Sequence, residues 1–324
     1  MVFCFKCGAN NSEFNEICSN CKSPLFTKDN LKLGKYYHFE QIFTDKNLKI
    51  LDNHNFTEED YNIIIENIQQ MGHYNLDNIT KSGKYSFDSI LSKIAAITAS
   101  YATVNYKSRG AELGSYAFNL INIDDRLDSA NQIATLIHEL THHLVSEIFE
   151  QILMYVWEVE KSDVLEAFVF FCLTCNPIPM LMNEYCAHSV EGRFVPHGYQ
   201  NYGSFNNVLV ENFDIEKDID MVIQCSIYGN TIANDLINLL ESFINENLRE
   251  EIKNQFRKDF RHPPKYDQIL FERKEIMTSE SLIESIFTTL IVGFRLAREK
   301  DAREILDAFK DNYKDINQMQ KTFD

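Results

Sequence analysis

The sequence has no excess of basic charge, no evident secretory leader and no unbroken apolar run of membrane-spanning length. Its 31 Lys and Arg residues are outnumbered by 48 Asp and Glu residues, which gives a net charge of −17. Such a chain repels nucleic-acid phosphates, so we expect no nucleic-acid partner. Because no basic segment leads into an apolar one at the start, we expect no secretory signal and a cytoplasmic location.

The most apolar stretch runs from Leu165 to Met182 and is interrupted by Glu166, Asn176, Pro177 and Pro179. Proline and charge at these positions favour a buried helix, a turn and a second helix over a membrane span. We therefore expect no association with a membrane.

The length of 324 residues, 44% of them hydrophobic, is enough to bury one large core and leave a small additional unit. The pattern predicts a mostly helical α+β fold. We divide the chain into residues 1–27, a linker with short strands at 28–56, and a helical domain at 57–324. Helical periodicity begins at Thr57 and continues in "FDSILSKIAAITASYA".

Four cysteines near the start have the spacing of a zinc site. They form two C-x2-C pairs separated by ten residues: Cys4, Cys7, Cys18 and Cys21. Each pair suits a tight turn that directs two thiolates at one tetrahedral Zn²⁺, and the segment resembles a short zinc ribbon. The alternative, two disulfides, requires an oxidising compartment that nothing else in the sequence indicates.

A site with four thiolates leaves no open position on the metal, so we expect this zinc to be structural. The basic and acidic residues of the ribbon are balanced, which favours a protein partner over DNA. A transcription-associated ribbon protein is a further interpretation, but the acidic charge of the chain disfavours it.

The other four cysteines are Cys172, Cys175, Cys186 and Cys225. We expect them to be buried small apolar side chains. Cys172 and Cys175 also form a C-x2-C pair, so a redox pair or a second structural zinc site is the alternative.

The segment "IATLIHELTHHL" predicts an amphipathic helix, because apolar residues recur in it at helical spacing. Ser129 and Gln132 are expected to form a capping box at its start. His138 and His142 are one turn apart, where one cation can bind both rings. Glu139 is rotated by about 100° from His138, so it is placed to act on a metal-bound water rather than on the metal. His143 lies off this face and is interpreted as a surface or supporting group.

A third ligand is expected from the segment "NEYCAHSVEG". Glu184, His188 and Glu191 follow one another at i, i+4 and i+7, so they share one helix face. Glu184 is the first candidate, Glu191 and His188 are the next, and Glu166 is a remote option. The stretch "SYAFNLINID" alternates and predicts a strand from Tyr116 to Ile123.

Residues 110–200 resemble the gluzincins, zinc metallopeptidases in which an HExxH helix and a glutamate on a second helix bind the metal. In thermolysin-like members that glutamate follows an asparagine, as Glu184 follows Asn183 here. An aspartate four residues later supports a zinc-binding histidine in those enzymes, whereas this sequence has His188 there. The resemblance implies a zincin-like core.

By this resemblance His138, His142 and Glu184 would bind a catalytic zinc and Glu139 would be the general base. His188 and Glu191 would support the ligands. The strand from Tyr116 to Ile123 would be an edge strand that pairs with the substrate.

Gluzincins also stabilise the oxyanion with a nearby His or Tyr. His197 is the first candidate for that role, followed by Tyr199 and Tyr202.

The sequence thus predicts a zinc peptidase with one catalytic and one structural zinc ion, acting on a peptide or protein substrate. The alternative is a non-catalytic module that uses a zincin scaffold to bind metal or a partner. The presence of Glu139 disfavours the alternative, because a purely structural zinc has no use for a base.

Overall fold

The computed structural model describes residues 2–3, 10–11, 19–20, 39–53, 57–60, 62–64, 86–98, 102–107, 112–243, 246–259 and 301–323. The described part is mainly helical with a small three-stranded sheet, as the composition predicts. The strands are β1 (Val2–Phe3), β2 (Asn10–Asn11), β3 (Thr103–Tyr106), β4 (Gly114–Ala117) and β5 (Leu120–Ile123). The helices are α2 (Phe39–Ile42), α3 (Asp45–Asn53), α5 (Phe87–Thr98), α6 (Ser129–Trp157), α7 (Asp163–Thr174), α8 (Pro177–Phe194), η2 (His197–Tyr199), α9 (Gly203–Asn212), α10 (Ile215–Phe243), α11 (Glu246–Lys258) and α14 (Ala302–Phe323).

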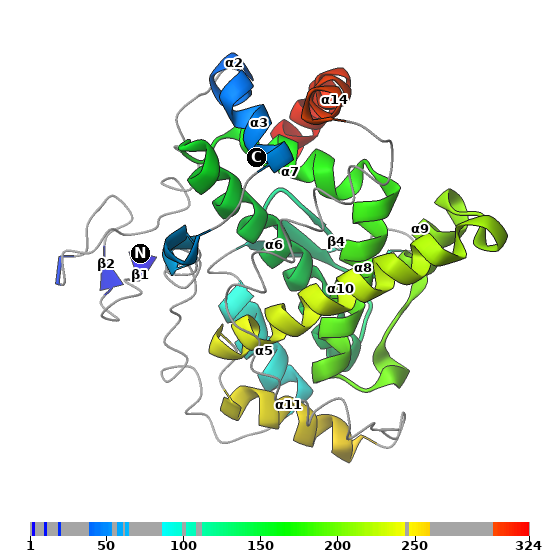
Figure 1. The fold of residues 1–324 in the computed structure, drawn as a ribbon. Coiled ribbons are helices and arrows are strands. Elements are labelled where there is room, and N and C mark those ends of the chain that lie inside the picture. Colours follow the sequence, from blue (N-terminus) through cyan, green and yellow to red (C-terminus); the bar gives the residue numbers. More distant parts are fainter. Residues whose placement is uncertain are drawn as a thin grey trace.

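Helix α6 lies at the centre of the molecule and packs against α5, α7, α8 and the sheet (Figure 1). It is buried along most of its length because neighbours cover it on several sides. Its N-cap is Asp128, whose carboxylate accepts a hydrogen bond from the Asn131 backbone N–H. The predicted capping box of Ser129 and Gln132 is therefore wrong, since the Gln132 side chain donates to the Leu127 carbonyl instead.

The predicted single strand from Tyr116 to Ile123 is two strands. β4 and β5 are antiparallel, and Ala117 pairs with Leu120 across a two-residue turn. Phe118 and Asn119 make this turn possible by adopting φ values of 46° and 62°. The sheet order is β3-β5-β4, so β5 is central and fully buried, and β4 is the edge strand beside α6.

The apolar stretch around Pro177 forms two helices, as predicted. α7 ends at Thr174, and α8 begins at Pro177 with Asn176 as its N-cap. The two helices meet at an angle of 86°. Within the described residues no single helix has the length and apolar composition to cross a membrane, and only this bent pair has both when taken together.

The prediction of a linker with short strands at 28–56 is wrong for its described part. Residues 39–53 form α2 and α3, and Ile42, Phe43 and Leu48 pack into the main core. They contact α14, so segments from both ends of the chain lie side by side on the same face of the molecule (Figure 1).

An aromatic cluster joins α14 to the core. The Phe309 ring is fully buried and lies 5.1 Å from that of Phe39 and 5.2 Å from that of Phe168.

We expect Phe309→Ala to lower the free energy of unfolding by about 3–5 kcal/mol, because it leaves a cavity between three segments. Urea unfolding followed by circular dichroism measures this. Met319→Ala on the exposed side of α14 is the control and should change stability by less than about 0.5 kcal/mol. Equal effects would show that α14 is not anchored through Phe309.

Candidate metal centre

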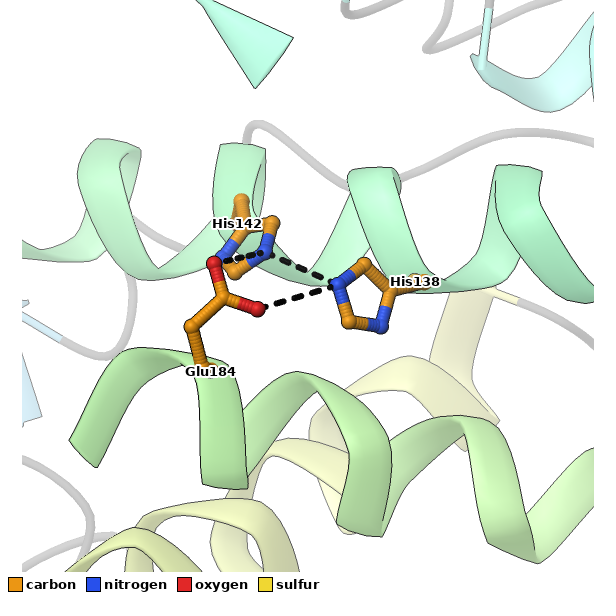
Figure 2. A group of neighbouring side chains, drawn as sticks. All are labelled: His138, His142 and Glu184. Atoms are coloured by element: carbon orange, nitrogen blue, oxygen red, sulfur yellow. Dashed lines mark hydrogen bonds and ion pairs between the residues drawn. The ribbon is translucent and has the colours of Figure 1, made fainter. Parts of the chain in front are cut away.

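The structure brings together the three side chains that the sequence predicted as ligands. His138 and His142 are buried on α6, one turn apart, and their Nε2 atoms are 3.1 Å from each other. Glu184 reaches them from α8, with Oε2 3.5 Å from His138 Nε2 and Oε1 3.6 Å from His142 Nε2. Figure 2 shows the carboxylate facing both rings across the space between the two helices.

These separations fit a tetrahedral cation. With bonds of about 2.0–2.1 Å to zinc, the ligand atoms of a tetrahedral site lie about 3.3 Å apart. All three donor groups offer atoms within 4.8 Å of one another. Glu184 Oε2 is also buried without a hydrogen-bond partner. Two imidazoles and a carboxylate are a ligand set that catalytic zinc uses, with a fourth position left for water.

The carboxylate next to His138 belongs to Glu191. In thermolysin-like enzymes the corresponding carboxylate is at the position that His188 occupies here. Glu191 Oε2 lies 3.4 Å from His138 Nδ1 and 3.1 Å from His188 Nδ1. The other nitrogen of His188 is 3.2 Å from Ser204 Oγ on α9. Glu191 is therefore placed to orient the His138 ring, and His188 holds Glu191 in that position.

The charges around the centre favour a cation there. Burial acts to lower the pKa of His138, but the nearby carboxylates of Glu184 and Glu191 outweigh this effect and hold the pKa well above the usual value. Burial lowers the pKa of His142 to about 4, so its ring is neutral and free to act as a ligand. Burial also acts to raise the pKa of Glu184, but the two histidines outweigh it and the pKa lies below the usual range.

Glu139 is on α6, the helix that carries His138 and His142, and it is not one of the three candidate ligands. Its pKa is raised to about 8, mainly by burial, with the negative charges of Glu184 and Glu191 adding to this effect and His138 opposing it. A dication bound between the histidines and Glu184 would offset those negative charges, so it would lower the pKa of Glu139.

Gly114 on β4 makes the close approach of the strand to α6 possible. A Cβ atom at this position would lie 2.4 Å from Thr135 Cγ2 and 2.6 Å from Glu139 Oε1. Any side chain here would therefore displace Glu139. Gly114 lies two residues before the predicted strand from Tyr116 to Ile123 and was not among the predicted site residues; a glycine next to a predicted strand was the available signal.

The candidate centre opens into a cleft of about 590 Å³ between β4, α6, α8 and the segment around η2. β4 contributes Gly114, Ser115 and Tyr116 to one wall. Such a cleft, with a strand edge along one wall and polar groups at its centre, has the form of a substrate site.

The predicted oxyanion residues do not gather at the centre. His197 is exposed on η2, packs against the Tyr202 ring, and is not among the described residues that line the cleft. Tyr199 does line it, but its hydroxyl donates to Asp259 at 2.5 Å. The Tyr202 hydroxyl donates to Gln200. The role that the sequence suggested for His197 is therefore not supported by its position.

Two other residues singled out in the sequence lie away from the centre. His143 is buried against the Tyr116 ring, 5.7 Å between ring centroids, so the interpretation as a surface group is wrong. Glu166, the remote ligand option, accepts hydrogen bonds from Asn119 and Gln320 instead.

The cysteines divide as follows. Cys172, Cys186 and Cys225 are buried and form no disulfide, as predicted, whereas Cys175 at the end of α7 is exposed. The four cysteines of the predicted ribbon lie outside the described residues. β1 and β2 are antiparallel to each other. In the sequence β1 lies just before the first C-x2-C motif and β2 just after it.

Comparisons with protein-family models, with curated proteins and with solved structures found no match. The assignment of a function therefore depends on the geometry described above.

We expect His138→Ala to remove one zinc ion per chain, because it takes away one of three converging ligands. Metal content of the dialysed protein, measured by inductively coupled plasma mass spectrometry, tests this. His197→Ala is the matched control and should keep the wild-type content, since that histidine is exposed outside the cleft. Equal zinc in His138→Ala and wild type would contradict the metal centre.

Proposed function

We propose that this protein is a zinc-dependent peptidase with a zincin-like core. The observation that carries the proposal is the convergence of His138, His142 and Glu184 at a cleft, with Glu139 beside them. A structural zinc site would have four protein ligands and no need of an adjacent base. Three ligands, a base and an open cleft are what a hydrolytic site requires.

The residues of the chain divide the work of hydrolysis. When zinc is bound at the centre, it polarises the substrate carbonyl and lowers the pKa of a water molecule. Glu139 then accepts the proton of the attacking water and delivers it to the nitrogen of the leaving amine. Glu191 keeps the His138 ring in orientation, and the buried position of the centre strengthens these electrostatic interactions.

β4 is the strand that aligns the substrate. It lies at the edge of the sheet and lines the cleft, so an extended peptide can add to it through backbone hydrogen bonds. The sequence assigned substrate pairing to one strand from Tyr116 to Ile123. We assign it to β4 alone, because β5 is buried between its two neighbours in the sheet.

We also propose that Cys4, Cys7, Cys18 and Cys21 bind a second, structural zinc and that this ribbon docks a protein partner. The spacing of the cysteines carries this proposal. A cytoplasmic location agrees with the buried, unoxidised thiols of Cys172 and Cys225, because reducing compartments keep cysteines out of disulfides.

Glu139→Gln should retain zinc and lower kcat/KM for peptide cleavage by a factor of about 10²–10⁴, since the amide occupies the same space and cannot accept the proton. Cleavage of a quenched fluorescent peptide library and metal content are measured on the same samples. Glu211→Gln, an exposed change on α9, is the control and should behave as wild type. If Glu139→Gln cleaves peptides as fast as wild type, the enzymatic proposal is wrong.

Gly114→Val should keep the zinc and the fold but reduce kcat/KM by about tenfold or more, because its side chain displaces Glu139. Kinetics and metal content together separate this effect from loss of the centre. An unchanged rate would show that the approach of β4 to Glu139 does not matter for catalysis.

A further inference from the structure

The lining of the cleft points to the class of peptide that it accepts. We propose that the cleft binds an internal segment of a polypeptide, with an apolar side chain at one end and a neutral or basic side chain at the other. This inference rests on the proposed peptidase function and specifies its substrate.

The cleft continues on both sides of the metal centre. Six residues of α6 line it, and all but Glu139 recur at intervals of three or four positions: Asn131, Thr135, His138, His142 and Ser146. At 1.5 Å per residue, the run from Asn131 to Ser146 is about 22 Å long. An extended peptide covers that distance with six or seven residues at about 3.3 Å each. Because the histidines lie inside this run, substrate residues have room on either side of the bond that is cleaved.

β4 lies beside the middle of this stretch of α6, and its direction identifies the two ends of the cleft. Gly114 lies against Thr135 and Glu139, and Tyr116 lies against His143. The start of β4, with Glu112 just before it, is therefore at the Asn131 end of the cleft. The turn after β4 is at the Ser146 end.

The Ser146 end is apolar. Phe170, Leu173 and Met180 line the cleft there, and the Phe170 ring stacks on Phe118 in the β4–β5 turn at 4.4 Å. These side chains come from α7, the start of α8 and the turn. A leucine or methionine of the substrate can bury apolar surface against them, whereas a charged side chain would lose its hydration.

The Asn131 end is polar and negatively charged. Four glutamates line the cleft, and three of them, Glu139, Glu184 and Glu191, belong to the metal centre. Glu112 is the fourth; it is exposed and close enough to raise the pKa of Glu139. A lysine or arginine of the substrate gains from this charge, and an aspartate or glutamate is repelled.

A carboxypeptidase must hold the terminal carboxylate of its substrate, commonly with a cationic side chain. Among the described residues that line the cleft, none is Lys or Arg. This composition, together with a cleft that extends past both sides of the centre, favours cleavage within a chain over removal of C-terminal residues.

The experiment digests a library of peptides from a proteome with the full-length zinc-loaded protein and identifies the products by mass spectrometry. We expect internal cleavage, an apolar residue enriched at one side of the cleaved bond, Lys or Arg enriched at the other, and Asp and Glu depleted. Glu112→Lys should lower the ratio of kcat/KM for a Lys-containing peptide to that for its Glu-containing counterpart by about tenfold. Raising the salt concentration should shrink the wild-type ratio.

Asp311→Lys is the matched control: it makes the same change of charge on the exposed face of α14, which contributes no residue to the described cleft lining, and should leave the ratio as in wild type. Release of terminal residues alone would overturn this inference and leave the peptidase proposal standing. Internal cleavage without a charge preference, or equal ratios for Glu112→Lys and wild type, would overturn the part assigned to Glu112. No cleavage of any peptide would instead refute the peptidase function itself.

Discussion

The contact of one partly buried carboxylate on α8 with two buried imidazoles on α6 requires two segments about forty residues apart to pack in a single register. Burying any of these groups alone would be costly, because a charged or polar side chain loses its hydration there. Glu184 lies within 3.5–3.6 Å of both rings, and Glu191 meets the other side of His138. A shift of α8 by one residue along its axis would separate these groups, so the packing of the two helices and the chemistry of the site depend on each other.

Buried charged side chains are also paired along the second half of α6, away from the candidate metal centre. Lys161 is nearly buried and lies 2.9 Å from Glu150, and it also pairs with Glu147. Next to this group, Glu166 accepts hydrogen bonds from Asn119 in the β4–β5 turn and from Gln320 on α14. These hydrogen bonds tie the β4–β5 hairpin and the helix α14 to α7, which packs against α6. The edge strand is held at the cleft by this network as well as by apolar packing.

Local sequence signals predicted some elements well and others badly. The helices α5, α6, α7 and α8 follow from apolar periodicity, and Asn176 and the prolines after it explain the break between α7 and α8. The hairpin was predicted as one strand, because side chains alternate in the same way before and after its two-residue turn. Phe118 is an unusual residue for a turn with positive φ, and its ring stacks on that of Phe170. The helices at 39–53 are buried by contacts with α6, α7 and α14, which are distant in the sequence and which no local pattern indicates.

The sequence by itself determined the residue types and their spacing along single elements: two histidines and a glutamate on one helix turn, and three polar groups on one face of α8. Helical periodicity is a local property, so such placements can be deduced without a fold. Tertiary packing decides which of those polar groups meets which histidine: Glu184 lies near both, Glu191 and the His188 ring lie against His138, and His197 is not among the described residues that line the cleft. Those outcomes depend on how helices and strands distant in sequence approach one another, and no local pattern encodes that approach.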